Sequence, residues 1–402
     1  MMFGSKKSKE NKRVYLDWAA ATPLLPAAYD AMKPFLTDSY ANPSAIHREG
    51  QAARDAVEAA RGSVASALQV RPEFVTWTGS GTEANNIAIL GTVEQLRQAG
   101  RLYVDMEIVS TAIEHPSVTR TLAHLESLGV TIHQVAVKES GVIDLNALRE
   151  LLNEKTVLLT THYINSEIGT IQPTRAIKKV LHELAPEALL HIDAAQAPLW
   201  VSCQFSSVGA DLLTLDAGKC CGPKGVGMLV RKHGVDLAPV VFGGGQEIGL
   251  RPGTEHVAAI VAAATAVSWA QDEHAWRDRA AQVVQVRDQA IEHIMQEIPT
   301  AILNGVDPSS SDRVANNINL SIPGLDTEFA TVVLDKHGFA VSTKSACSGA
   351  GGGASSVVVA TTDDFARATS TFRITLGPDT TLGCIQNLTK VLKNHIEQMA
   401  KY

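Results

Sequence analysis

The pattern of apolar and polar positions alternates between a helical and a strand period from residue 46 to about residue 270. Apolar side chains recur at three-, four- and seven-residue steps from Ile46 to Leu68, which predicts an amphipathic helix. The run FVTWT (74–78) predicts a strand, and residues 81–98 are predicted to form the helix after it. Further short apolar runs predict strands at 107–111, 156–162, 189–192, 211–215 and 226–230. Because helix-like or loop segments separate most of these Val-, Ile- and Leu-rich strands, we expect an α/β fold with a largely parallel sheet covered by helices.

This rhythm ends at a long helical stretch over residues 267–298, which we interpret as a connector between domains. Strands at 316–322 and 371–376, with helices near 327–338 and from about 381, predict a smaller α+β domain. A chain of 402 residues is long enough for two domains. We therefore expect a disordered tail at 1–13, a large domain at 27–266, and a small domain formed by 14–26 and 267–402.

Composition narrows the class of protein. A formal charge of −7 gives no general attraction to nucleic acid or to anionic membranes. No run of about 18 apolar residues occurs, so no membrane span is expected, and the basic start lacks the apolar region of a secretory signal. Five cysteines in 402 residues do not make a disulfide framework, which indicates a reducing compartment and predicts a cytoplasmic location.

Polar residues that follow the predicted strands are candidates for chemistry, because ligands of open α/β sheets bind at the carboxyl ends of strands. Residues 79–83 (GSGTE) can bind a phosphate through backbone N–H groups and the Thr82 hydroxyl, or can be ordinary helix-capping residues. Asp193 can hold a pyridinium nitrogen, or can cap a helix. Lys219 can form a Schiff base, or can extend its amine to solvent.

Four further positions complete a consistent set. His115 follows the strand at 107–111, where an imidazole can stack on a ring or move protons. Thr254 lies in a glycine-dense stretch (242–256) that permits close backbone approach. Cys347 lies in the Gly/Ser-rich loop 345–356, and Arg373 can bind a carboxylate with two N–H groups. Together these features predict a pyridoxal-phosphate enzyme that binds an amino acid and attacks its side chain with a cysteine.

At this point the sequence resembles the cysteine desulfurase family, class V of the aminotransferase-fold enzymes. The similarity runs from VYLDWAAATPLLP (14–26) to FRITLG (372–377) and includes, in the family's order, NPSAIHREG, GSGTEANNIA, EHPSV, NSEIGTIQP, HIDAAQA, GPKGVG, FGGGQEIGLRPGTEH and SACS. The resemblance implies aminotransferase fold type I, in which a large domain with a mostly parallel seven-stranded sheet is joined to a smaller α+β domain. It also implies conversion of L-cysteine to L-alanine and a cysteine persulfide, which is passed to acceptor or scaffold proteins for iron–sulfur cluster assembly or tRNA thiolation.

The resemblance further implies a role for each motif residue. Lys219 binds the cofactor covalently, Asp193 pairs with the ring nitrogen, and His115 stacks on the ring and moves protons. The remaining cofactor contacts implied are Gln196 and Ser166 at the ring oxygen, Gly81 and Thr82 at the phosphate, and Thr254 at the phosphate of the other subunit of a homodimer. For the substrate, the implied residues are Arg373 at the carboxylate, Asn42, His47 and Asn165 nearby, and Cys347, which takes the sulfur in the subgroup with a long catalytic loop.

The chain departs from the family pattern just before the lysine. The family usually has Ser-x-His-Lys, with serine and histidine on the phosphate, whereas this chain has Asp216, Ala217 and Gly218 before Lys219. A carboxylate at roughly 4 Å from a phosphate charge costs about 1 kcal/mol in water and ~4 kcal/mol at an effective dielectric constant near 20. Two arrangements are open: Asp216 turns away from the phosphate, or Gly218 offers its backbone N–H in place of the lost imidazole.

Three other interpretations stay open. A selenocysteine lyase shares FGGGQE and RPGTE closely, and the sequence separates the two substrates poorly. A non-catalytic homologue could keep the fold as a partner-binding subunit. A metal or redox role for Cys220 and Cys221 is disfavoured, because adjacent cysteines lack C-x-x-C spacing and have no histidine cluster with them, so we interpret them as packing residues and expect no metal.

Overall fold

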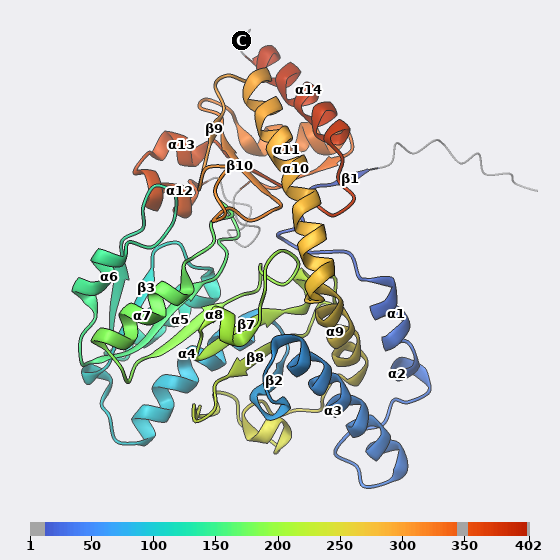
Figure 1. Ribbon diagram of the computed structural model, residues 1–402, viewed down its shortest axis with the longest axis vertical. Helices are drawn as coiled ribbons and strands as arrows, with labels where there is room; N and C mark the ends of the chain where they lie inside the picture. The colour runs from blue at the N-terminus through green and yellow to red at the C-terminus, as the bar shows by residue number, and fades with distance from the viewer. Residues whose placement is uncertain (1–12, 344–352, 400–402) are drawn as a thin grey trace, which may run out of the picture.

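A seven-stranded sheet forms the centre of the protein. The structure, a computed structural model, describes residues 13–343 and 353–399 (Figure 1). The strand order is β2-β8-β7-β6-β5-β3-β4, and only β8 runs antiparallel to its neighbours. The strands are β2 (Val75–Thr78), β3 (Glu107–Thr111), β4 (Thr131–Val135), β5 (Thr156–His162), β6 (Leu189–Asp193), β7 (Leu212–Asp216) and β8 (Gly227–Arg231). The expected mostly parallel, seven-stranded α/β sheet is confirmed.

Helices cover both faces of this sheet, because the central strands are apolar on both sides. All seven residues of β5 are buried. On one face α4 (Gly81–Gln98) and α5 (Pro116–Ser127) pack over a cluster that contains Ile89, Ile108 and Leu158. The other face forms the main core, with α3 (Arg48–Leu68), α6 (Leu145–Leu151), α7 (Thr174–Leu184), α8 (Phe205–Val208) and α9 (Val257–Ala270). Two short helices, α1 (Pro26–Met32) and α2 (Pro34–Thr37), lie against α9.

A smaller group of strands and helices, formed mainly by the last third of the chain, lies above the large sheet in Figure 1. An antiparallel sheet of order β12-β10-β9 combines Thr371–Thr375, Asn317–Ser321 and Ile302–Leu303, and β1 (Val14–Tyr15) pairs with β11 (Phe339–Ala340). The helices of this part are α10 (Glu273–Glu297), α11 (Thr327–Lys336), α12 (Ser356–Thr362), α13 (Phe365–Thr369) and α14 (Leu382–Met399). The domain boundaries expected from the sequence stay a prediction.

One expected helix was wrong, and one strand of the large sheet was missed. The helix expected over 267–298 is two helices, because Asp272 lies between α9 and α10 and its side chain accepts a hydrogen bond from the Ala275 N–H at 2.9 Å. Strand β4 had not been expected at all. It lies at the edge of the sheet and has mostly exposed or half-buried residues, so it carries no continuous apolar run.

The capping residues of α4 fix where that helix begins. The Ser80 hydroxyl accepts a hydrogen bond from the Glu83 N–H at 3.2 Å, and the Glu83 carboxylate accepts one from the Gly79 N–H. The Ser-x-x-Glu sequence is that of a capping box, but the Glu83 carboxylate binds the N–H of Gly79, one residue before the N-cap, in place of the N–H of Ser80 itself. The N-terminus of an 18-residue helix is thereby placed at the carboxyl end of the central strands. No helix in the described ranges is long and apolar enough to cross a membrane.

A histidine lies inside the sheet, between three neighbouring strands. His191 of β6 shares hydrogen bonds with the Thr160 hydroxyl of β5 at 2.8 Å and the Thr214 hydroxyl of β7 at 3.0 Å. Burial lowers the pKa of His191 to about 4, from an ordinary value of 6.5. Between these two pH values the unfolded chain binds a proton at His191 that the folded protein excludes. Acidification through this window therefore lowers the free energy of unfolding.

Replacing His191 should remove this part of the pH dependence. From pH 7 to pH 5 the wild-type protein should lose about 2 kcal/mol more unfolding free energy than His191→Asn, since one pKa unit corresponds to about 1.4 kcal/mol. Urea unfolding of both proteins at the two pH values measures the difference. Equal losses in the two proteins would contradict the assignment.

Candidate active site

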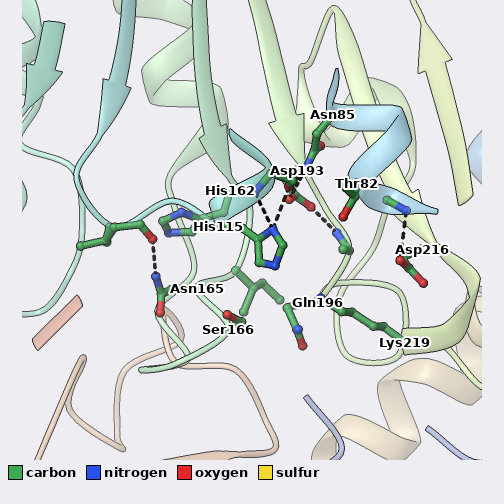
Figure 2. Close-up of a pocket in the computed structure, with 15 residues that line it drawn as sticks. Thr82, Asn85, His115, His162, Asn165, Ser166, Asp193, Gln196, Asp216 and Lys219 are labelled. Atoms are coloured by element: carbon green, nitrogen blue, oxygen red, sulfur yellow. Dashed lines mark hydrogen bonds between the residues drawn. The ribbon is translucent and has the colours of Figure 1, made fainter. Parts of the chain in front are cut away.

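A pocket opens at the carboxyl ends of β3, β5, β6 and β7, beside the first turns of α4 and α5 (Figure 2). It encloses about 470 Å³, counting the part open to solvent. The topology brings together residues far apart in the chain because parallel strands end at the same edge of the sheet. Nine residues predicted from the sequence line this pocket: Gly81, Thr82, His115, Asn165, Ser166, Asp193, Gln196, Asp216 and Lys219.

Asp193 is the buried anion of the pocket. Its carboxylate accepts hydrogen bonds from the Asn85 amide at 2.7 Å and from the Ala195 N–H at 3.0 Å. Burial alone would raise the pKa of Asp193, but the Lys219 ammonium, these two donors and His115 together lower it. Asp193 is therefore ionised at neutral pH and faces the pocket with a full negative charge.

His115 lies at the start of α5 as its N-cap. Its Nδ1 accepts a hydrogen bond from the Ser117 N–H at 3.1 Å and lies 2.7 Å from the Ser117 hydroxyl. Burial, followed by the charge of Lys219, lowers the pKa of His115. The imidazole is therefore neutral at pH 7. With Nδ1 acting as acceptor, the proton is assigned to Nε2.

Lys219 ends the single 3₁₀ turn η3 (Ala217–Lys219) that follows β7. Its amine lines the pocket, and its charge acts on both Asp193 and His115. The two cysteines that follow it are buried in the main core. Burial raises the pKa of both thiols, most strongly that of Cys220, so both are held as neutral thiols.

Asp216 does not turn away from the site. Its Oδ2 accepts a hydrogen bond from the Gly81 N–H, the first residue of α4, at 3.0 Å. Its Oδ1 accepts one from the Gly218 N–H at 2.9 Å. The Gly218 N–H is thus used by a carboxylate of the chain itself. The Thr82 hydroxyl, next to this contact, has no hydrogen-bond partner within residues 13–343 and 353–399.

Arg373 is buried and contacts the backbone of the pocket residue Ser166. One terminal nitrogen donates to Asp17 Oδ1 at 2.8 Å, and the other donates to the Ser166 carbonyl at 2.9 Å. Its Nε is buried and has no partner in the described part of the chain. The neighbouring Asn165 uses its amide oxygen to accept from the Glu167 and Ile168 N–H groups, at 2.9 and 3.0 Å, so it shapes the loop after β5.

Apart from Arg373 and Gly218, whose contacts are given above, three predicted residues in the described part of the chain do not line the pocket. Thr254 is exposed in the 242–256 segment, and Asn42 bonds the Ser44 N–H at 2.9 Å in an exposed turn. His47 caps α3 by accepting from the Gly50 N–H at 3.2 Å. Cys347 lies outside the described residues, so its assignment stays a prediction.

The chain on either side of residues 344–352 is anchored at this site. Ser342 exchanges two backbone hydrogen bonds with Arg373, at 2.7 and 3.1 Å. On the other side the Ser355 hydroxyl donates to the Glu167 carboxylate at 2.6 Å. Glu167 lies in the loop after β5, and Arg373 of β12 donates to the Ser166 carbonyl of the same loop. The segment that contains Cys347 therefore leaves and re-enters the described structure beside the pocket.

Sequence reasoning missed two groups. Asn85, inside α4, bridges Asp193 and the Ser117 hydroxyl, at 2.7 and 2.8 Å. Under the pocket, Glu114 Oε1 lies 2.9 Å from His162 Nδ1 and accepts from the Thr161 hydroxyl at 3.0 Å. The sequence around Asn85 indicates only an ordinary helix residue, because its partner Asp193 is 108 positions away in the chain. Glu114 stands next to His115 in EHPSV, which was the available signal.

Pyridoxal phosphate, the cofactor that the resemblance implies, needs a partner for its ring nitrogen, an amine that binds it and donors for its phosphate. The ring end fits, because an ionised buried carboxylate, a lysine amine and a neutral imidazole face one cavity. At the phosphate end the donor N–H groups of Gly81 and Gly218 are present, and the Asp216 carboxylate is bound to them. The pocket thus fits the cofactor, with one internal anion at its phosphate end.

Comparison with known proteins agrees with this geometry. Residues 14–388 match the family model described as "Aminotransferase class-V". The chain is 35% identical over 391 residues to "Cysteine desulfurase IscS" of Dictyoglomus turgidum, covering 96% of this chain and 95% of that protein. It is 33% identical to "Putative cysteine desulfurase IscS 1" of Bacillus subtilis, with 97% and 99% of the two chains covered.

Solved structures with the same fold include a protein titled "NIFS-LIKE PROTEIN", at a TM-score of 0.87 and 29% identity, covering 96% of this chain and 99% of that one. Another is titled "SspA in complex with cysteine", at a TM-score of 0.76 and 31% identity, covering 90% and 99%. The chain belongs to the class-V aminotransferase family and, within it, to the cysteine desulfurases, which are enzymes that use pyridoxal phosphate.

Proposed function

We propose that this cysteine desulfurase converts L-cysteine to L-alanine and carries the sulfur as a persulfide on Cys347. In the net reaction the Cβ–S bond of L-cysteine breaks and an S–S bond forms between the substrate sulfur and Cys347. The electron pair of the broken bond stays with Cβ, which gains a proton, so atoms and electrons balance. The persulfide sulfur then passes to an acceptor or scaffold protein for iron–sulfur cluster assembly or tRNA thiolation.

One observation carries this proposal: three side chains, ionised Asp193, Lys219 and neutral His115, line one pocket at the edge of the sheet. Bound pyridoxal phosphate supplies an electron sink next to the substrate's α carbon. Asp193 holds a proton on the ring nitrogen, because its negative charge is kept by its hydrogen-bond donors. Lys219 holds the cofactor and takes the α proton, and His115 moves a proton at Nε2.

Arg373 is proposed to bind the substrate carboxylate. Its Nε is a buried donor with no partner among the described residues, and its other two nitrogens are already oriented by Asp17 and the Ser166 carbonyl. A guanidinium held in this way has little conformational entropy left to lose when the substrate binds. Cys347 is proposed as the sulfur acceptor, because the segment that carries it is anchored on both sides at Arg373 and Glu167.

Alanine release tests the proposal. Purified protein saturated with pyridoxal phosphate and given L-cysteine and a thiol reductant should form alanine steadily. Cys347→Ser should lower the rate by about 100-fold or more, because the nucleophile is removed. Cys384→Ser is the matched control: this thiol lies on α14, accepts a hydrogen bond from the Thr381 hydroxyl at 3.3 Å, and should be dispensable.

The same assay separates the alternatives. Alanine from selenocysteine but not from cysteine would indicate a selenocysteine lyase. No alanine from either substrate, with the cofactor bound, would indicate a non-catalytic, partner-binding homologue. A Cys347→Ser protein as active as the wild type would contradict the assignment of the sulfur carrier.

We also propose a homodimer in the cytoplasm. Exposed apolar side chains gather near the 242–256 segment, where Ile46 and Ile248 line one groove and are 88% and 81% exposed. Buried Glu247 fixes this segment through a two-point contact with Arg61, with both N–O distances 2.8 Å. Thr254 in the same segment would then reach the pocket of the other subunit. The described cysteines are free thiols, which supports a reducing compartment.

Replacing one exposed apolar residue should separate the subunits. Ile248→Asp should sediment as a monomer at concentrations where the wild type is a dimer, because a charge would be buried in the interface. The backbone of Ile248 has φ 59°, a region that Asp tolerates, so the fold should persist. Phe365→Asp, at another exposed apolar site, on α13, should stay dimeric. A monomeric wild type would contradict the proposal.

A further inference from the structure

The carboxylate of Asp216 occupies an anion-binding position inside the pocket. It accepts hydrogen bonds from two backbone N–H groups that belong to different elements, Gly81 at the start of α4 and Gly218 in η3, at 3.0 and 2.9 Å. Figure 2 shows Asp216 bonded to the first residue of the helix, beside Thr82. The N-terminus of an 18-residue helix carries partial positive charge, and Lys219 adds a full charge nearby.

The backbone holds this contact tightly. Asp216 pairs with Gly227 in β8, and a Cβ on Gly227 would lie 2.3 Å from the Ser80 carbonyl carbon and 2.7 Å from the Gly81 nitrogen. Strand β8 therefore packs directly on the peptide that begins α4. A Cβ on Gly81 would lie 3.2 Å from the Asp216 carboxylate. The Asp216 carboxylate is thus placed against the Gly81 N–H by the close approach of β8 to the start of α4 and by the absence of a side chain at Gly81. It can leave this N–H only by rotating its own side chain.

These donors are the ones that a bound phosphate would use. Backbone N–H groups at a helix N-terminus, the Thr82 hydroxyl, which has no partner among the described residues, and a lysine amine make up a phosphate-binding environment. The two N–H groups cannot serve the carboxylate and a phosphate at the same time. A phosphate beside an ionised Asp216 also meets a like charge within contact distance.

We infer that Asp216 is an internal competitor for the phosphate group of the cofactor, an inference that rests on the proposed function. Without cofactor, Asp216 satisfies the N-terminus of α4 and stabilises the protein. With cofactor, the phosphate displaces the carboxylate from Gly81 and Gly218. Asp216 therefore lowers the affinity for pyridoxal phosphate, while it leaves recognition of the ring by Asp193 and Lys219 unchanged.

Binding measurements on apoprotein test this without any assay of activity. The dissociation constants of pyridoxal phosphate and of phosphate-free pyridoxal are measured by absorbance for wild type, Asp216→Asn and Asp216→Ser. Both variants should bind pyridoxal phosphate about tenfold or more tightly, because one like charge is removed, and should bind pyridoxal as the wild type does. Without ligand both variants should melt at a lower temperature, because α4 loses its anion.

Asp326→Asn is the matched control. Asp326 caps α11 by accepting from the Phe329 N–H at 3.0 Å, so the substitution removes the same charge from a helix N-terminus outside the pocket. It should change neither dissociation constant. Inorganic phosphate provides a second probe: it should raise the melting temperature of Asp216→Asn apoprotein and leave that of the wild type unchanged.

The outcomes separate this inference from the proposed function. Weaker binding of pyridoxal phosphate by both variants would overturn the inference and make Asp216 a cofactor ligand. An equal gain for pyridoxal would also overturn it, since the charge would then act on the ring. If no protein bound pyridoxal, the proposed function would fail, and the phosphate-dependent melting shift would still decide whether Asp216 competes for this anion position.

Discussion

The whole pocket depends on keeping one carboxylate ionised inside the protein. Asp193 ends a buried strand, where burial alone favours the neutral acid. The Lys219 charge, the Ala195 N–H and the Asn85 amide reverse this preference. The Ala195 N–H comes from the turn directly after β6, whereas Asn85 lies in α4 and Lys219 follows β7. Asn85 and Lys219 reach Asp193 because parallel strands end at one edge of the sheet. The fold therefore supplies the partners that stabilise a buried negative charge at this position.

A second carboxylate lies at the end of the neighbouring strand, and it does something different. The Asp193 carboxylate faces the cavity, whereas the Asp216 carboxylate accepts hydrogen bonds from two backbone N–H groups. The two strands β6 and β7 are hydrogen-bonded neighbours, and both carboxylates line the same pocket. In the proposed function the Asp193 end receives the positively charged ring of the cofactor. The Asp216 end receives the phosphate, at a position that already contains an anion of the chain itself.

The sequence predicted most of the sheet and the residues of the pocket, and the reasons are local. Residues 107–111 and 156–162 each contain a short apolar run, Ile108–Val109 and Val157–Leu159, and the structure has strands with the predicted bounds. The spacing of Ser80 and Glu83 predicts where α4 begins. Candidate residues at strand ends could be found because strand ends are where open α/β sheets bind ligands.

The features that could not be predicted depend on contacts between residues that are far apart in the chain. Strand β4 is an edge strand with little buried surface, so its pattern is weak. The bridge from Asn85 to Asp193 joins positions that no local pattern connects. The direction of the Asp216 side chain depends on how closely β8 approaches α4 at Gly227. Asn42, His47 and Thr254 lie away from the pocket of their own chain, so a single sequence cannot place them.

The central claim is that Lys219 holds pyridoxal phosphate in the pocket that Asp193 organises. Peptide mass spectrometry after reconstitution and borohydride reduction tests it most directly, because reduction makes the lysine–cofactor link permanent. The account predicts the added cofactor mass on Lys219 alone. The same mass on Lys224, whose amine donates to the Thr22 carbonyl at 2.7 Å, or an unlabelled Lys219 in saturated protein, would contradict it.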